Sequence, residues 1–240
     1  MNLLLLTPGE AAGELVKLPN GDRRAVHLLS IVKVTPGDQI DIGVMGGNLG
    51  RAEIISVDSG SVVLRPDSMA ILPPPPIPLT LVLALPRPKM LRRTLQSAVS
   101  LGIKRICVCH ARKVDKSYWQ SPYLTESAMF ANTLLGLEQS MDTQLPVITL
   151  HQRFKPFVED DLPAITQGTR RLLGAVNGLP SADFRASEGA PITLAVGPES
   201  GFIPYEVERF LEAGFEAVSL GDRVLRVETA LPALVGALLL

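Results

Sequence analysis

The chain has 240 residues, of which 46% are hydrophobic and 20% are charged, and its formal net charge is −1. This length and apolar content suit one large domain or two modest ones, and they argue against intrinsic disorder. The near-neutral charge argues against a uniformly basic nucleic-acid binder but leaves room for a local basic patch.

The sequence predicts neither secretion nor a membrane partner. Residues 1–6 lack the positive charge that opens a signal peptide. The apolar segment 230–240 is interrupted by Pro232 and is shorter than the roughly 20 residues that span a bilayer. Cys107 and Cys109 alternate within an apolar run and are expected to be buried free thiols. The histidines are far apart, so we expect no metal site. Because neither a signal peptide nor a membrane span is predicted, we expect a cytoplasmic protein.

A run of prolines at residues 73–76, followed by Pro78, divides the chain. Such a run is stiff and extended and cannot join a β-ladder. Before it, short apolar segments alternate with turns, a pattern typical of a small β-barrel. Strands are predicted at residues 26–34, 39–44, 51–57 and 61–64. The predicted domains are a β-barrel at residues 1–72, a linker at 73–78 and a second domain at 79–240.

Beyond the linker, apolar strand segments alternate with helical segments, which predicts an α/β domain whose parallel sheet is covered on both faces. Strands are predicted at residues 79–85, 103–109, 147–150, 171–176, 192–196 and 217–220. Helices are predicted at residues 89–101, 124–140 and 204–213, and from residue 228 onward. Ligands of such sheets bind outside the carboxyl ends of the strands.

Two glycine-containing turns follow predicted strands of the second domain. They are GPESGF at residues 197–202 and LGDRVLRVETA at residues 220–230. Glycine lets the backbone approach a ligand closely, and N–H groups at a helix start are free to bind a polar group. The two turns therefore predict a small-molecule site at one edge of the sheet. The charged side chains available for chemistry there are Glu199, Arg223, Arg226 and Glu228.

Three common site motifs are missing from the sequence. No GxGxxG follows a strand and no GxxxxGK[ST] occurs, which disfavours a classical dinucleotide fold and P-loop phosphoryl transfer. Ser200 lies one position too late for the GxSxG turn of a serine hydrolase.

Basic residues gather in the first domain and at the start of the second. For any one of them, a solvated surface position is the simpler interpretation. Together they indicate RNA contact, because Tyr118, Trp119 and Tyr123 lie nearby and aromatic rings stack on bases. The candidate RNA-binding residues are Arg23, Arg24, Lys33, Arg87, Lys89 and Arg92.

The two glycine turns resemble motifs of the SPOUT methyltransferases, most closely those of the RsmE family, which methylates N3 of a uridine in 16S ribosomal RNA. That family's pattern is close to GPEGGF, followed by LGxR[IV]LRxETA. The similarity extends upstream to Lys89-Met90, to residues 96–102, to Glu138-Gln139 and to residues 27–38.

The resemblance implies a PUA-like N-terminal β-barrel and a C-terminal α/β domain with a trefoil knot. It implies S-adenosylmethionine bound in the knot by backbone groups, ribosomal RNA or the small ribosomal subunit as substrate, and a homodimer. Neither a metal nor a membrane is expected as a partner. The implied cofactor-binding residues are Val176, Val196, Gly197, Pro198, Glu199, Gly201, Leu220, Gly221, Arg223 and Leu225.

The implied reaction needs a proton acceptor, because uridine N3 carries a proton at neutral pH. Arg226 and Glu228 are the catalytic candidates. Arg226 could stabilise negative charge on the base oxygens, and Glu228 could orient Arg226 or take the proton. Glu228 could instead serve only the first helical turn, and Glu199 is more simply a brace of its loop.

The chain departs from the family pattern in several places. Ser200 replaces a usual glycine, and Ile203 stands where a Ser or Thr would cap the next helix. Residues 111–114 replace a Glu-Arg-Ser-like segment, and residues 140–142 lack a usual arginine. Two alternatives therefore stay open: a paralogue that methylates a different RNA nucleotide, and a non-catalytic RNA-binding or ribosome-assembly protein.

Overall fold

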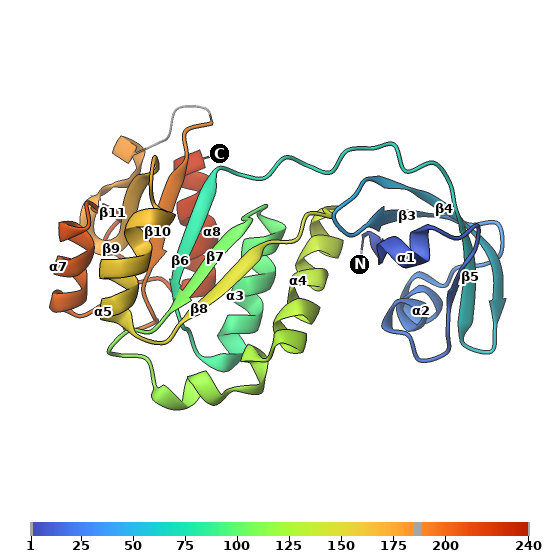
Figure 1. Cartoon of the computed structure of the whole chain (residues 1–240), viewed down its shortest axis with the longest axis horizontal. Helices are drawn as coiled ribbons and strands as arrows, with labels where there is room; N and C mark the ends of the chain where they lie inside the picture. The colour runs from blue at the N-terminus through green and yellow to red at the C-terminus, as the bar shows by residue number, and fades with distance from the viewer. Residues whose placement is uncertain (1, 185–188, 240) are drawn as a thin grey trace. The chain divides into compact units, whose positions relative to one another are not determined.

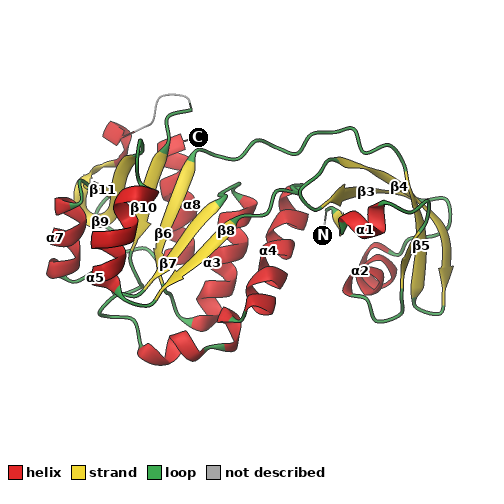
Figure 2. Cartoon of the chain, viewed as in Figure 1, coloured by secondary structure: helices red, strands yellow, loops and turns green. Residues whose placement is uncertain are grey.

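The structure is a computed structural model that describes residues 2–184 and 189–239. Its contacts divide the chain into two compact units (Figures 1 and 2). The first unit contains the residues up to Pro75 together with Leu134–Leu145. The second contains Pro76–Thr133 and the residues from Pro146 onward. The domain bounds stated above stay a prediction.

The first unit, at residues 2–75 and 134–145, contains a five-stranded sheet in the order β1-β3-β4-β5-β2. β1 runs parallel to β3, and the other pairs are antiparallel. The core holds Leu6, Leu18, Ile42 and Ile54. The strands are β1 (Leu4–Leu6), β2 (Val16–Leu18), β3 (Gln39–Val44), β4 (Leu49–Asp58) and β5 (Ser61–Pro66).

The strands predicted in the second half of this unit are confirmed, because β3, β4 and β5 cover residues 39–44, 51–57 and 61–64. β1, β2 and the short helix α1 (Pro8–Ala11) were not predicted. Closure of the sheet into a PUA-like barrel stays a prediction.

The strand predicted at residues 26–34 is wrong, because this segment is helical. Helix α2 (Arg23–His27) continues into the π-turn η1 (Leu28–Val32), which ends at Lys33 in the left-handed region with φ 61°. The Asp22 side chain caps α2 by accepting a hydrogen bond from the Arg24 backbone N–H at 2.8 Å. A short apolar run does not by itself distinguish a strand from a packed helix, and this cap decides between them.

The second unit, described over residues 76–133, 146–184 and 189–239, contains a six-stranded parallel sheet in the order β11-β9-β10-β6-β7-β8. Its strands are β6 (Leu79–Ala84), β7 (Arg105–Cys109), β8 (Val147–His151), β9 (Arg170–Pro180), β10 (Ile192–Val196) and β11 (Glu216–Ser219). The predicted α/β class with a parallel sheet is confirmed. The trefoil knot stays a prediction.

Helices cover this sheet on two faces, as Figure 1 shows: α3 and α8 lie on one face, and α5 and α7 on the other. The main helices are α3 (Pro88–Ser100), α4 (Glu126–Ser140), α7 (Pro204–Glu212) and α8 (Val227–Leu239). The chain between β8 and β9 forms α5 (Phe154–Pro156), η4 (Phe157–Asp161) and α6 (Leu162–Ile165). Shorter 3₁₀ turns are η2 (Lys116–Gln120), η3 (Pro122–Leu124) and η5 (Ser181–Phe184). No helix of the described residues is long and apolar enough to cross a membrane.

An irregularity in β9 shapes the carboxyl edge of the sheet. Ala217 of β11 pairs with Leu173 of β9, but the next residue, Val218, pairs with Leu179. Residues 174–178 therefore bulge out of the ladder between β9 and β11. The predicted strand at 171–176 misses this feature, because regular alternation gives no sign of a bulge.

Candidate functional site

A pocket of about 290 Å³ lies in the second unit, at the carboxyl ends of β9, β10 and β11. Its walls are the β9 bulge, the turn after β10, the loop after β11 and the first turns of α8. This is the edge at which ligands of parallel sheets bind. The lining residues are Leu173, Gly174, Ala175, Val176, Val196, Gly197, Pro198, Glu199, Gly201, Phe202, Val207, Val218, Ser219, Leu220, Gly221, Arg223, Val224, Leu225, Val227, Ala230 and Leu234.

All ten residues assigned above to cofactor binding line this one pocket. They come from β9, the end of β10 with the turn after it, and the loop after β11, which are distant in sequence but adjacent in the sheet, because β9 lies between β10 and β11. Gly201 and Gly221 have φ values of 70° and 109°, a region that side chains with a Cβ rarely adopt. Glycine at these two positions therefore permits the turns that expose backbone groups to the pocket.

Ser219 joins two walls of the pocket, and it was not among the predicted site residues. Its Oγ lies 2.9 Å from the Val176 carbonyl oxygen, to which it donates, and it accepts the Gly221 backbone N–H at 3.0 Å. The side chain is almost fully buried. Serine hydroxyls commonly accept the N–H two residues ahead, so a serine just before a glycine loop was the available signal.

Phe202 anchors the end of the turn after β10. Its ring packs on Phe210 of α7, with centroids 5.1 Å apart, and on Phe154 of α5 at 6.4 Å. Ile203 provides no side-chain cap for α7. Glu206 compensates, because its Oε2 accepts the Ile203 backbone N–H at 2.9 Å.

Glu199 lines the pocket and also braces its loop. Its Oε1 accepts the Arg87 backbone N–H at 3.3 Å, so it joins the loop after β6 to the turn after β10. This contact supports the structural interpretation of Glu199 given above.

The two catalytic candidates lie beside the pocket and are not among its lining residues, although their neighbours Leu225 and Val227 are. Arg226 is exposed, and its backbone carbonyl accepts from Thr229 N at 2.9 Å, which starts α8. Glu228 is half-buried. Within the described part of the chain, its Oε2 is buried and has no hydrogen-bond partner.

The backbone carbonyl of Glu228 also lacks its regular helical donor. Pro232 lies inside α8 and has no N–H, so it cannot donate to the carbonyl of Glu228 four residues earlier. A buried carboxylate oxygen without a donor is costly and is often explained by a ligand or a catalytic role. In the first turn of α8, Glu228 Oε2 is therefore available to accept a hydrogen bond or a proton from a ligand beside the pocket.

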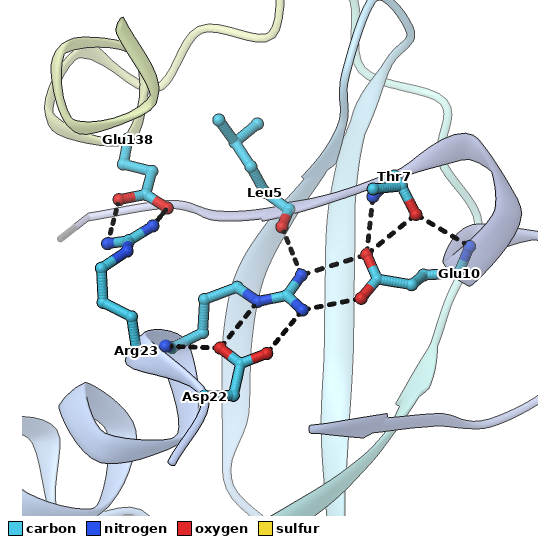
Figure 3. A network of polar contacts seen from close by, with 7 residues as sticks. Leu5, Thr7, Glu10, Asp22, Arg23 and Glu138 are labelled. Carbon is cyan, nitrogen blue, oxygen red and sulfur yellow. Dashed lines mark hydrogen bonds and ion pairs between the residues drawn. The ribbon is translucent and has the colours of Figure 1, made fainter. Parts of the chain in front are cut away.

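Two of the candidate RNA-binding residues have their guanidinium groups engaged in the first unit (Figure 3). Arg23 forms a two-point ion pair with Glu138, with N–O distances of 2.6 and 2.8 Å. Arg24 contacts Glu10 at 2.6 Å, Asp22 at 2.8 Å and the Leu5 carbonyl at 2.9 Å. Their contacts support a structural role.

The remaining candidates Lys33, Arg87, Lys89 and Arg92 are exposed, as an RNA contact requires. Of the nearby aromatic residues, Trp119 already makes a hydrogen bond within the protein: its Nε1–H donates to His110 Nδ1 at 3.0 Å. Burial lowers the pKa of His110, which favours the neutral imidazole, the form that can accept this hydrogen bond. Cys107 and Cys109 are buried free thiols, as predicted.

Comparison with known proteins gives one consistent result. Residues 73–239 match the model of the RNA methyltransferase domain family. Ribosomal RNA small subunit methyltransferase E of Treponema pallidum is 30% identical over 237 residues, covering 96% of this chain and 87% of the relative. The protein of that name from Mycobacterium bovis is 26% identical, with coverages of 92% and 85%.

Two solved structures share the fold across nearly the whole chain. A methyltransferase from Legionella pneumophila, solved with S-adenosylmethionine, has a TM-score of 0.76 at 21% identity, covering 98% of this chain and 96% of that one. Ribosomal RNA small subunit methyltransferase E of Neisseria gonorrhoeae, also bound to S-adenosylmethionine, has a TM-score of 0.73 at 23% identity, with the same coverages.

Proposed function

Because the chain belongs to the RNA methyltransferase domain family, and to the ribosomal RNA small subunit methyltransferase E family within it, we propose that it methylates N3 of a uridine in 16S ribosomal RNA with S-adenosylmethionine as methyl donor. The observation that carries this proposal is the pocket. Ten residues chosen from two sequence motifs and one further strand end converge on it.

The pocket suits S-adenosylmethionine in size and in chemistry. Its volume of about 290 Å³ is close to the lower end of the range of roughly 300–1,000 Å³ that is usual for small-molecule sites. Backbone groups of Gly197–Gly201 and Leu220–Leu225 would hold the flat, neutral adenine, and the apolar Leu173 and Leu234 line the same space. When bound, the cofactor supplies an electrophilic sulfonium methyl group.

The residues beside the pocket manage the proton and the charge of the substrate. As the N3–methyl bond forms and the sulfur–methyl bond breaks, uridine N3 must lose its proton. Glu228 Oε2 is the acceptor in this proposal, because it is buried and has no donor among the described residues. Exposed Arg226, two positions earlier, stabilises negative charge on the base oxygens.

Four exposed cations are proposed to hold the RNA backbone: Lys33, Arg87, Lys89 and Arg92. The family resemblance supports a homodimer with a shared active site, a PUA-like barrel, a trefoil knot and ribosomal RNA or the small ribosomal subunit as partner. The buried free thiols fit a reducing compartment such as the cytoplasm.

Nucleoside mass spectrometry of 16S ribosomal RNA, from cells with and without the gene, tests the proposal. Loss of N3-methyluridine on deletion, and its return with the wild-type gene, is the expected result. An unchanged N3-methyluridine signal contradicts the proposed target. A different missing methylated nucleoside would indicate the paralogue instead.

The altered residues at 140–142 favour a second candidate, a non-catalytic RNA-binding or ribosome-assembly protein. In the structure these residues serve local contacts: Ser140 Oγ donates to the Gly136 carbonyl at 3.0 Å, and Asp142 Oδ1 accepts Gln144 N at 2.8 Å. Transfer of labelled methyl groups to RNA by the purified protein contradicts this candidate.

A further inference from the structure

The turn at residues 111–114 leaves the sheet beside the proposed cofactor pocket. It follows β7, which is parallel to β6 and β10, so the turn emerges at the same edge as the turn after β10. Ala111 and Val114 are buried, and Val114 N donates to the Ala111 carbonyl at 2.9 Å. The two buried ends fix the turn and leave Arg112 and Lys113 exposed.

Two hydrogen bonds tie this turn to the segment that forms a pocket wall. Lys113 Nζ donates to the Ser200 carbonyl at 2.7 Å. The Arg112 backbone N–H donates to Glu206 Oε1 at 2.6 Å. Glu206 is only 2% exposed, and its other oxygen holds Ile203 N, so one buried carboxylate joins both segments.

The Lys113 contact acts on the peptide group between Ser200 and Gly201. That peptide group is planar, so its C=O and N–H orient together. On one side of this peptide group, the Gly201 N–H donates to the Pro198 carbonyl at 2.7 Å. On the other side, the Ser200 carbonyl accepts the hydrogen bond from Lys113. Pro198 and Gly201 line the pocket. A charge-assisted hydrogen bond from Lys113 therefore fixes the orientation of the pocket wall.

Two departures from the family pattern meet at this contact. Ser200 stands in place of a usual glycine, and Lys113 belongs to the segment that replaces the Glu-Arg-Ser-like residues. The aromatic candidates Tyr118 and Trp119 follow six positions or fewer after Lys113, and Trp119 is tied back to His110, the residue directly before the turn.

We propose that Lys113 is a positioning residue that couples the pocket wall to the basic and aromatic segment at residues 110–124. Cofactor in the pocket orders the wall, the wall holds Lys113, and Lys113 holds the segment that contacts RNA. Coupling between two binding sites is reciprocal, so RNA on this segment raises the affinity for the cofactor by the same factor. The proposed coupling has two halves: the effect of the cofactor on residues 110–124, and the binding of RNA to them. The second, RNA half rests on the proposed function.

Hydrogen exchange with mass spectrometry tests the cofactor half without RNA. Addition of S-adenosylmethionine to the wild-type protein is expected to slow amide exchange across residues 110–116. Lys113→Met is expected to lose this protection, and Lys113→Arg to keep it. Lys116→Met is the control for charge, because Lys116 is an exposed lysine of the same segment. Equal protection in wild type and Lys113→Met overturns the proposal.

The RNA half is tested by measuring the affinity for 16S ribosomal RNA lacking this methylation, with and without cofactor. The cofactor is expected to tighten RNA binding of the wild-type protein and of Lys116→Met by about 5-fold, the lower end of usual coupling. Lys113→Met is expected to show a ratio near one. If Lys113→Met shows the same ratio of RNA affinities as the wild-type protein, the proposed coupling is wrong. An absent N3-methyluridine product contradicts only the proposed reaction, because the hydrogen-exchange result does not depend on it.

Discussion

Ser219 is a single buried hydroxyl that holds both the β9 bulge and the loop after β11. Ser219→Ala removes one hydrogen bond on each side and leaves the Val176 carbonyl without this donor. We expect S-adenosylmethionine affinity to fall about 10-fold, equivalent to roughly 1.4 kcal/mol for a buried acceptor that loses its partner.

Isothermal titration calorimetry of Ser219→Ala against wild type measures this loss. Ser200→Ala is the matched control, because Ser200 is exposed in the turn after β10 and contributes its backbone carbonyl to Lys113. Equal affinities of wild type and Ser219→Ala would show that the two walls hold their places without this hydroxyl.

Glu228 has the buried, unpartnered oxygen that the proposed proton transfer needs. Glu228→Gln keeps the side chain's size but removes its basicity. A positioned general base contributes about 10²–10⁴-fold, so we expect kcat for RNA methylation to fall at least about 100-fold, with cofactor affinity within about 2-fold. Single-turnover methyl transfer measures the first quantity and calorimetry the second.

Glu208→Gln, at an exposed position of α7, is the control for Glu228→Gln. If Glu228→Gln retains wild-type kcat, Glu228 is a first-turn helix residue and the proton leaves by another route.

At the scale of elements, the β9 bulge forms one wall of the pocket. Gly178 returns the chain to β11, and a Cβ there would lie 2.6 Å from Val218 N and 2.7 Å from the Ala217 carbonyl carbon. Backbone atoms cannot yield as a flexible side chain does. We expect Gly178→Ala to destabilise the protein by about 1–3 kcal/mol, as overpacking does, and to weaken cofactor binding.

Denaturant unfolding measures the stability of Gly178→Ala. Gly236→Ala in α8 is the control, because its added Cβ meets no atom within 4 Å, and alanine in a helix is favoured over glycine by about 1 kcal/mol. If Gly178→Ala is as stable as wild type, β9 and β11 can move apart to accommodate the added Cβ without a loss of folding free energy.

The elements also show where local sequence stops being informative. The apolar run at 192–196 is β10 to the residue, because a strand buried on both faces reads as a continuous apolar run. The run at 26–34 reads almost the same way but is helical as far as Val32, with Leu28 buried and Ile31 exposed. The cap from Asp22 and the ion pairs of Arg24 decide the helix, and neither follows from apolar periodicity.

At the scale of the molecule, the Arg24 network predicts how the protein responds to acid. Hydrogen bonds from Arg24 hold the pKa values of Glu10 and Asp22 below their ordinary values. A carboxyl whose pKa is lower in the folded state stabilises the protein above its unfolded pKa. This stabilisation is lost as the pH falls below about 4.5 and through the lowered values.

Arg24→Met leaves two partly buried carboxylates without their partner, and we expect a loss of about 2 kcal/mol at pH 7, discounted for partial exposure. The loss should shrink as the pH falls from 7 to below about 4.5, because protonated Glu10 and Asp22 no longer need the cation. Thermal unfolding followed by circular dichroism across this range measures both effects.

Arg51→Met breaks a more exposed pair with Asp41, at 3.5 Å, and serves as the control. A pH-independent loss in Arg24→Met would assign the effect to lost packing of the arginine stem rather than to charge.

The sequence by itself determined the parallel α/β sheet and the glycine turns that follow its strands, because apolar runs, helix stops and glycine requirements are local properties. The resemblance of those turns to family motifs supplied ten of the residues that line the pocket. Only the tertiary structure decided the β9 bulge, the role of Ser219, the engagement of Arg23 with Glu138 and the contact of Lys113 with Ser200. The hydrogen bonds from Ser219 to Val176, from Lys113 to Ser200 and from Arg23 to Glu138 join residues that are 43, 87 and 115 positions apart. A hydrogen-bond partner at such a distance in sequence is chosen by the packing of whole elements, and no local pattern encodes it.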